Sequence, residues 1–134
     1  IDQNFIQDDI SVSRRHVLRG LHGDDKTWKL VSCIEGALLL AVVNFHVGSD
    51  QYLRWETFEL TEENRLQVLI PAGFANGHVI LSDRAIFSYK QTELYNGERQ
   101  FTLRWDEPAL GIDWPITDPI LSERDRKAAY MEAC

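Results

Sequence analysis

Short strand-like segments follow one another along nearly the whole chain. They are rich in β-branched and aromatic residues and are separated by turns that contain Gly, Asp or Asn. Strands are expected at residues 5–13, 16–21, 29–34, 37–44, 52–60, 66–70, 78–81, 85–91 and 101–105. Short strands at this spacing are typical of an all-β sandwich or barrel. The pattern therefore predicts one jelly-roll barrel whose mouth is the ligand site.

One helix and one tight turn stand out from this pattern. The helix is expected to begin at Ser122 and to run to residue 133, because Ser122-x-x-Asp125 is a helix-start motif. Glu35-Gly36 is a candidate hairpin turn between two strand segments. At 134 residues the chain has room for one core, so a single domain over residues 1–134 is expected.

The amino-acid composition limits the kinds of molecule that the chain is expected to bind. The chain has 14 Lys and Arg against 21 Asp and Glu, and its net charge of −7 argues against nucleic acid. No apolar run approaches the roughly 18 residues that a membrane span needs, so no membrane is expected either. Cys33 lies in an apolar run and Cys134 is terminal, so the cysteines predict free thiols and a reducing, cytoplasmic setting.

The segment from Val17 to His22 holds the most informative candidate site residues. It places Arg19 and His22 three residues apart, so a regular strand would point them to opposite faces. Gly20 lies between them, where a kink or bulge would fall. A bend at Gly20 would let a cation and a titratable base converge on one pocket.

Three side chains further along the chain would complete a site that can form an enolate. Lys29 adds positive charge, Tyr89 a phenol and Asp125 a carboxylate. Taken singly, each candidate has an ordinary structural explanation. His22 can be a half-buried strand residue, and Lys29 an edge-strand charge. Tyr89 can be a wall residue with its hydroxyl in water, and Asp125 part of a helix cap. Only the combination of a base, a cation, a phenol and a carboxylate favours a catalytic site over these structural explanations.

Further motifs, in the same order along the chain as in a known enzyme family, cover nearly the whole sequence. They are Phe5-Ile6-Gln7-Asp8-Asp9, Val17 to His22, Lys29-Leu30-Val31, Ile70-Pro71-Ala72-Gly73-Phe74-Ala75, Leu81-Ser82-Asp83, Tyr89-Lys90, Trp105-Asp106, Gly111-Ile112-Asp113-Trp114-Pro115 and Leu121-Ser122-x-x-Asp125. With these motifs the chain resembles the dTDP-4-dehydrorhamnose 3,5-epimerase family, sugar-nucleotide epimerases of the cupin superfamily. The resemblance implies an all-β double-stranded β-helix jelly roll with a short C-terminal helix.

The resemblance also implies catalytic roles. The family's base matches His22 and is paired with an aspartate that matches Asp125. The family's acid matches Tyr89, and the lysine that steadies the enolate matches Lys29. No redox cofactor is required for this chemistry, and none is expected.

A further set of residues is expected to bind the nucleotide-sugar substrate. These are Gln7, Asp9, Arg19, Asn76, His78 and Lys90. The first three match family positions that help to hold the nucleotide sugar, while Arg19, Lys29 and Lys90 could bring positive charge to an anionic ligand. No metal is expected, because the four histidines form no His-x-His pair and no obvious facial triad.

Departures from the family pattern bear on the substrate and on assembly. Ala75-Asn76-Gly77-His78 stands where the family usually has Ala-His-Gly-Phe, and the loop between His22 and Lys29 is shorter than usual. Both features are similar to a subgroup that acts on GDP-linked 6-deoxy-4-keto-heptoses. The family's N-terminal segment, which contacts the nucleotide across a dimer, is expected to be missing. A homodimer paired near the chain start is expected, with pockets more open at the nucleotide end.

The expected function is inversion of C3, C5 or both in a nucleotide-linked 4-keto-6-deoxy sugar, in deoxysugar or cell-surface polysaccharide biosynthesis. Removing a proton beside the C4 ketone needs a positioned base, and an imidazole titrates near working pH, at about 6.5. Two alternatives stay open at this point, a 3,4-ketoisomerase and a non-catalytic sugar-nucleotide-binding cupin. Solvent deuterium at an inverted centre would indicate the epimerase, a moved carbonyl the isomerase, and no exchange a binding protein.

Overall fold

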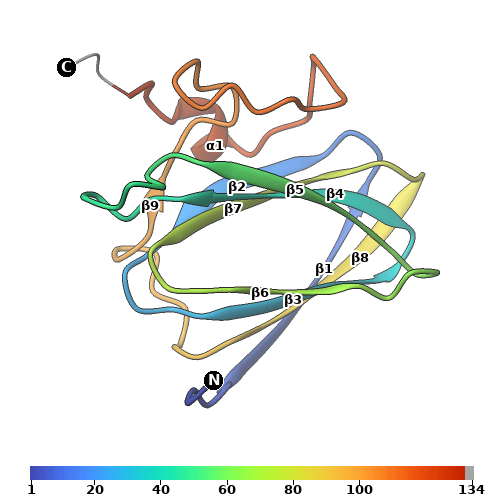
Figure 1. The fold of residues 1–134 in the computed structure, drawn as a ribbon. Coiled ribbons are helices and arrows are strands. Elements are labelled where there is room, and N and C mark those ends of the chain that lie inside the picture. Colours follow the sequence, from blue (N-terminus) through green and yellow to red (C-terminus); the bar gives the residue numbers. More distant parts are fainter. Residues whose placement is uncertain (132–134) are drawn as a thin grey trace.

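Two antiparallel sheets face each other in the computed structural model, which describes residues 1–131 (Figure 1). The first sheet contains β1 (Gln7–Arg14), β8 (Arg84–Gln91), β3 (Lys29–Glu35) and β6 (Gln67–Ile70), in that order. The second contains β5 (Trp55–Thr61), β4 (Ala37–Asn44), β7 (Phe74–Ile80), β2 (Leu18–Gly23) and β9 (Phe101–Thr102), in that order. The short helix α1 (Glu123–Lys127) follows near the C-terminal end. The predicted all-β jelly roll with a short C-terminal helix is thereby confirmed.

Each predicted strand segment carries a strand, although the bounds differ. The largest difference is in β7, which begins at Phe74 rather than at residue 78. Asn76 and Gly77 are poor strand formers, but pairing with β4 and β2 on either side keeps them extended. A side chain at Gly77 would not fit, because an added Cβ would lie 2.9 Å from the carbonyl oxygen of Arg19.

The predicted hairpin at Glu35-Gly36 is wrong. β3 and β4 follow each other directly, yet β3 pairs with β6 and β8 while β4 pairs with β5 and β7. Gly36, at φ 86°, therefore turns the chain from one sheet into the other.

The predicted helix from 122 to 133 is also corrected, because α1 ends at Lys127 and Ala128 leaves the helical region at ψ 137°. Tertiary contacts hold the chain that follows. The backbone N–H of Met131 donates to Glu107 Oε2 at 2.6 Å, and the Tyr130 ring lies 4.6 Å from the Arg104 guanidinium. Residues 132 and 133 of the predicted helix, with Cys134, lie outside the described residues. In the part of the chain that is described, no helix has the length and apolarity to cross a bilayer.

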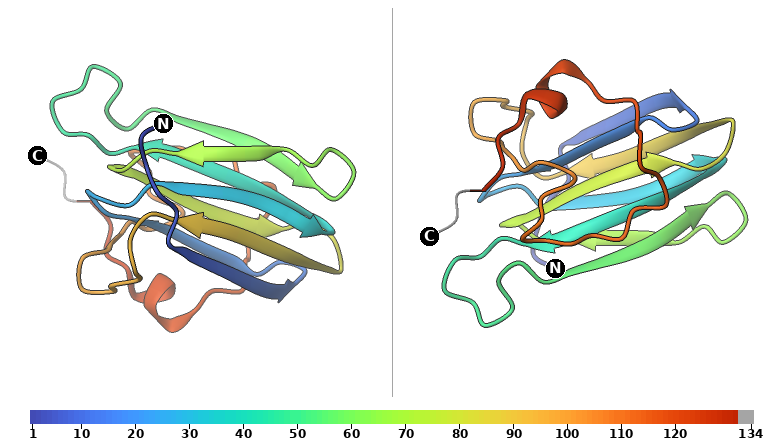
Figure 2. Two further views of the ribbon diagram at one scale, coloured as in Figure 1. Left: turned by 90° about the horizontal axis from the view of Figure 1, so that it is seen from below. Right: turned by 90° about the horizontal axis from the view of Figure 1, so that it is seen from above.

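The five-stranded sheet is covered on both faces. Between the sheets, Leu38 and Leu40 of β4 belong to the inner core. On the opposite face, Ala41 and Val43 pack with Trp114 of the C-terminal segment, which lies across this sheet (Figures 1 and 2). Burial on both faces explains why β4 is an almost continuous apolar run instead of an alternating one.

The four-stranded sheet differs, because its outer face is exposed. Side chains of β1 alternate between the interior and solvent, and Ile10 and Val12 are 65% and 56% exposed. Ile34 of β3 and Leu69 of β6 lie on the same side and are exposed as well. We call Ile10, Val12, Ile34 and Leu69 the outer apolar face.

A bulge in β2 decides where the candidate site residues point. Arg19 pairs with His78 and His22 with Asn76, so three steps along β2 oppose two steps along β7. Gly20 lies in this bulge at φ 133°, and an added Cβ would lie 2.5 Å from the Cα of Gly77. The expected bend is therefore present, and Arg19 and His22 line the same cavity.

Replacing the bulge glycine tests this close approach. We expect Gly20→Ala to lower the free energy of unfolding by about 3 kcal/mol, because it adds a steric overlap to an unfavourable φ. Gly48 is a matched control, since its φ is also positive, at 94°, but an added Cβ meets nothing within 4 Å. Gly48→Ala should cost about 1 kcal/mol. Equal losses in chemical denaturation would contradict a tightly packed bulge.

Candidate active site

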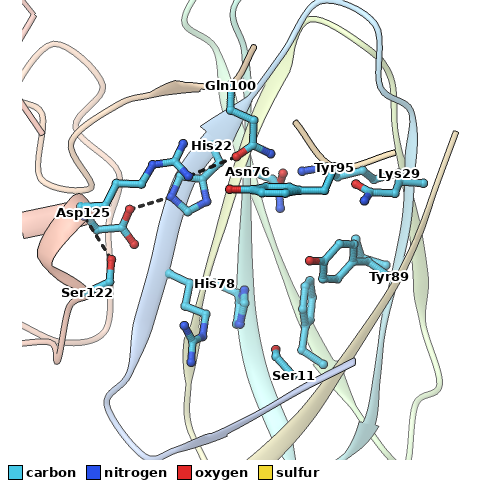
Figure 3. Close-up of a pocket in the computed structure, with 15 residues that line it drawn as sticks. Ser11, His22, Lys29, Asn76, His78, Tyr89, Tyr95, Gln100, Ser122 and Asp125 are labelled. Atoms are coloured by element: carbon cyan, nitrogen blue, oxygen red, sulfur yellow. Dashed lines mark hydrogen bonds and ion pairs between the residues drawn. The ribbon is translucent and has the colours of Figure 1, made fainter. Parts of the chain in front are cut away.

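A cavity of about 550 Å³ lies between the two sheets (Figure 3). Its walls come from β1, β2, β3, β7 and β8, from the loop between β8 and β9, and from α1. Seven of the predicted site residues line it: Arg19, His22, Lys29, Asn76, His78, Tyr89 and Asp125. The cavity thus brings together a base, a carboxylate, a phenol and cations from distant parts of the chain.

His22 and Asp125 form the shortest contact in the cavity that involves two titratable side chains. The distance from His22 Nε2 to Asp125 Oδ1 is 2.6 Å. The other oxygen, Asp125 Oδ2, accepts the backbone N–H of Gly20 at 3.1 Å. An ionised carboxylate can only accept, so the proton between the two side chains resides on Nε2. In the neutral imidazole the free lone pair is then on Nδ1, which makes Nδ1 the basic atom.

Asp125 is ionised although its side chain is only 1% exposed. Burial acts most strongly and by itself would raise the pKa of this carboxyl. The hydrogen bond and charge of His22, with the Gly20 amide and Ser122, outweigh burial and hold the pKa of Asp125 below its ordinary value. The carboxylate is therefore charged at neutral pH and can stabilise an imidazolium at His22.

The helix cap and the pair with His22 occur together rather than as alternatives. Ser122 is the N-cap of α1, and its hydroxyl accepts the backbone N–H of Asp125 at 3.1 Å. The cap bond itself is made by the backbone N–H of Asp125, and the carboxylate Oδ1 contacts His22. The cap explains Ser122 and the start of α1, but it does not explain where the carboxylate points.

Lys29 and Tyr89 lie side by side on the neighbouring strands β3 and β8, with Lys29 Nζ 5.9 Å from the centre of the Tyr89 ring. Burial lowers the pKa of Lys29, and the attraction of Asp24 offsets only part of this. Burial also raises the pKa of Tyr89, and the nearby carboxylate of Asp9 raises it further. Tyr89 therefore keeps its proton at neutral pH and can donate it.

His78 and Asn76 come from β7, on the face that looks into the cavity. Asn76 pairs across the strands with His22, and the ring of His78 stacks on Phe87 at 4.0 Å between centroids. Burial, helped by the positive charge of Arg19, lowers the pKa of His78 to about 3. His78 is therefore a neutral imidazole at working pH.

The predicted substrate-binding residues of β1 lie beside the cavity. Gln7 and Asp9 share the strand face of Ser11, which lines the cavity. Gln7 Nε2 donates to Asp9 Oδ2 at 2.7 Å, and Gln91 Nε2 donates to the same oxygen at 3.3 Å. These two residues extend the wall but do not line the cavity itself.

Lys90 is not brought to the cavity, contrary to expectation. It follows Tyr89 on β8, and because strand side chains alternate, it points to the outer side of the sheet. There its Nζ makes an exposed ion pair with Asp8 at 3.1 Å. The positive charge of Lys90 is therefore paired with Asp8 on the face of the sheet that points away from the cavity.

Arg124 supplies a cation that the sequence did not predict. It lines the cavity beside Asp125. Its Nε donates to Thr102 Oγ1 at 2.9 Å, and its Nη1 donates to Gln100 Oε1 at 3.3 Å. Tyr95 and Gln100, from the loop between β8 and β9, also line the cavity. A helix of five residues has too little periodicity to predict that Arg124 faces the cavity. Among the described residues, no three His, Cys, Asp or Glu side chains are grouped as metal ligands.

Comparisons with known proteins agree over almost the full chain. The model of the dTDP-4-dehydrorhamnose 3,5-epimerase family matches residues 1–133. The dTDP-4-dehydrorhamnose 3,5-epimerase of Methanothermobacter thermautotrophicus is 44% identical over 131 residues, which cover 94% of this chain and 71% of the relative. The enzyme of the same name from Pseudomonas aeruginosa is 42% identical over 134 residues, covering 97% of this chain and 74% of the relative.

Solved structures are similar in fold as well as in sequence. The dTDP-4-dehydrorhamnose 3,5-epimerase of Elizabethkingia anophelis superimposes with a TM-score of 0.91 at 42% identity, covering 95% of this chain and 72% of that one. A dTDP-6-deoxy-D-glucose-3,5-epimerase from Legionella pneumophila, in complex with dTDP-4-keto-L-rhamnose, has a TM-score of 0.93 at 38% identity. That match covers 97% of this chain and 71% of the Legionella chain.

The low pKa of Asp125 makes a prediction about stability in acid. Because its folded-state pKa is below the unfolded value of about 3.9, its contribution to stability is complete above that value. The contribution is lost as the pH falls through the folded-state pKa. We expect parent and Asp125→Asn to differ in melting temperature at pH 7 and to converge on acidification below about pH 4. Asp24, whose pKa is also lowered, is present in both proteins and cancels. A difference that keeps growing as the pH falls below about 4 would contradict an ionised, stabilised Asp125.

Proposed function

Because the chain belongs to the dTDP-4-dehydrorhamnose 3,5-epimerase family, we propose that the cavity around His22 and Asp125 is its active site. The protein is an epimerase of nucleotide-linked 4-keto-6-deoxy sugars and acts in deoxysugar biosynthesis. Family membership thus decides for the epimerase among the three functions that the sequence left open. The observation that carries the site assignment is the 2.6 Å contact of His22 with a buried carboxylate, in the same cavity as Tyr89 and Lys29.

In the first step of the proposed mechanism, His22 removes a proton from the carbon beside the C4 ketone. Nδ1 takes the proton, the C–H electron pair forms a C=C bond, and the carbonyl π electrons move to oxygen as an enolate. His22 becomes an imidazolium whose Nε2–H donates to Asp125. The buried carboxylate stabilises this positive charge and keeps the ring in one orientation.

Lys29 is positioned to stabilise the enolate oxygen. Its amino group is largely buried, near both the Tyr89 ring and the positive charge of Arg124. A hydrogen bond to a developing oxyanion is stronger in such a site than in water, and losing one typically costs about 100- to 1000-fold in rate. Lys29 is therefore the candidate for the group that stabilises the enolate.

Tyr89 is the candidate acid that completes the inversion. Its phenol proton passes to the same carbon from the face opposite His22, and the enolate electrons return to re-form the ketone. The raised pKa of Tyr89 keeps the phenol protonated until it is needed. A base and an acid on two faces of the sugar are what an epimerase requires, because a single group would return the proton to the side it left.

Substrate binding is proposed to use the cations that face the cavity. Arg19 donates to the hydroxyl of Ser13 and Arg124 to neutral oxygens, so among the described residues neither pairs with a carboxylate. Both guanidinium groups can therefore bind the diphosphate of a nucleotide sugar. Gln7, Asp9 and Asn76 remain proposed substrate contacts, the first two from the edge of the site. Lys90 is not part of this proposal.

Variants of the base and the acid should separate the two halves of the reaction. His22→Asn should abolish exchange of solvent deuterium into the sugar, because an amide cannot accept the proton, and should leave thymidine diphosphate binding intact. Tyr89→Phe should still exchange, through His22, but should not invert the centre. His46→Asn, at a histidine outside the cavity, should behave like the parent. Exchange at the parent rate in His22→Asn would exclude His22 as the base, and NMR of the sugar in D₂O measures both exchange and inversion.

The nucleotide is proposed to be thymidine diphosphate, since the relatives named above act on dTDP-linked sugars or carry that name. The subgroup resemblance suggested by Asn76-Gly77-His78 makes guanosine diphosphate the alternative. We expect thymidine diphosphate to raise the melting temperature, as ligand at 100 times its Kd contributes about 2.7 kcal/mol. Guanosine diphosphate at the same concentration should give no shift. The reverse result would identify the heptose subgroup, and no shift with either would contradict a nucleotide-sugar site.

Assembly into a homodimer through the outer apolar face is also part of the proposal. This face is made of exposed Ile and Leu or Val side chains on β1, β3 and β6, and β1 lies at the edge of its sheet. An exposed apolar patch and an open edge are both covered when two copies pair about a two-fold axis. A cytoplasmic location is proposed with it, because Cys33 is a buried free thiol.

Sedimentation of two matched variants tests the dimer. The parent should sediment at twice the 15.5 kDa mass of the chain at micromolar concentration. Ile10→Glu, which places a charge on the outer apolar face, should sediment as a monomer. Val47→Glu is the control, because Val47 is 82% exposed but lies in the loop after β4. A monomeric parent, or dissociation by both variants alike, would contradict this interface.

A further inference from the structure

His78 is a buried polar group that the proposed chemistry does not use. Only 4% of its surface is exposed, yet it lines the cavity. Its Nε2 has no hydrogen-bond partner within residues 1–131. A buried polar atom without a partner costs free energy, and such atoms are rare in native structures. The position therefore calls for an explanation beyond packing.

Packing explains the ring of His78 but not its nitrogens. The ring stacks on Phe87 with 4.0 Å between centroids and 21° between planes, a contact that a phenyl ring would make equally well. A second base is excluded as an explanation, because a group whose pKa is about 3 binds protons too weakly near neutral pH. What a neutral imidazole offers instead is one hydrogen-bond donor and one acceptor.

The place of His78 in the cavity indicates what it can reach. It lies two residues from Asn76 on β7, and Asn76 pairs with His22, so His78 is roughly 7 Å along the strand from the level of the base. Its neighbour Phe87, like Val31, belongs both to the cavity wall and to the inner core. His78 therefore lies beside an apolar part of the wall, at the end of the cavity that also holds Ser11 (Figure 3), and we call this end the floor of the cavity. A sugar ring whose reacting carbon faces His22 spans this distance with a substituent on its far side.

We propose that His78 hydrogen-bonds a sugar hydroxyl at the floor of the cavity and selects substrates that carry this hydroxyl. The inference rests on the proposed function and adds a specificity-determining residue to it. The hydroxyl can donate to the imidazole lone pair or accept from its N–H, so either tautomer serves. A site that pairs a buried polar group with a substrate hydroxyl discriminates against an analogue that lacks it, because the protein group is then left unpaired.

The variant His78→Phe separates this role from a structural one. Phenylalanine keeps a flat ring against Phe87 and removes both nitrogens, so we expect an unchanged or higher melting temperature. At the same time kcat/KM for dTDP-4-keto-6-deoxyglucose should fall about tenfold, the cost of one lost hydrogen bond. A lower melting temperature with unchanged kcat/KM would overturn the proposal in favour of a structural histidine.

Deoxy analogues then identify the hydroxyl. The parent should lose about tenfold in kcat/KM for inversion at C5 on either the 2-deoxy or the 3-deoxy analogue, and His78→Phe should show no further loss on that analogue. Calorimetric binding of the three nucleotide sugars provides a second readout that does not depend on turnover. Equal losses for His78→Phe on all three compounds would overturn the proposal, because the loss would not follow a hydroxyl. Binding without turnover by the parent would contradict the proposed function alone.

Discussion

The hydrogen bond between His22 and Asp125 is the interaction on which the rest of the site depends. It joins residues 103 positions apart and ties α1 to β2 at 2.6 Å. Two local features make it possible, the Gly20 bulge that turns His22 into the cavity and the Ser122 cap that starts α1 beside it. The Gly20 amide also donates to Asp125, so the bulge both aims the base and holds its partner. Base and carboxylate are thus fixed by backbone features before any substrate arrives.

Burial between the sheets shifts the pKa values of the other titratable groups around this pair. It lowers the pKa of Lys29 and of His78 and raises that of Tyr89, so the cavity holds a phenol with its proton and a neutral imidazole. The chain as a whole is acidic, at −7, yet Arg19 and Arg124 bring local positive charge to the cavity. An acidic protein can therefore bind an anionic sugar nucleotide, because binding depends on the charges in the cavity and not on the net charge.

Local patterns in the sequence predicted most of the strands, whereas features set by distant contacts were missed. Strand alternation and turn residues are local, and so is the glycine that marks the bulge in β2. The turn at Gly36 looked like a hairpin because sheet membership depends on which distant strands pair with β3 and β4. The helix was expected too long because Glu107, which holds Met131, is far away in the sequence.

The same contrast between local patterns and distant contacts explains which site residues were predicted correctly. Lys90 was misplaced because a shift of one residue along a strand moves a side chain to the other face. Arg124 was missed because a helix one turn long gives no periodicity that shows which side faces the cavity. Asp125 had two sequence explanations, and the geometry shows both, with the backbone in the cap and the carboxylate on His22.

The tautomer of His22 tests the central claim most directly. ¹⁵N NMR of the imidazole in the free enzyme at a pH where the ring is neutral reports which nitrogen carries the proton. The geometry predicts a proton on Nε2, donated to Asp125, and a lone pair on Nδ1 that is free to act as the base. A proton on Nδ1 would contradict the arrangement, because Asp125 could not then accept from His22 and the basic nitrogen would face the carboxylate.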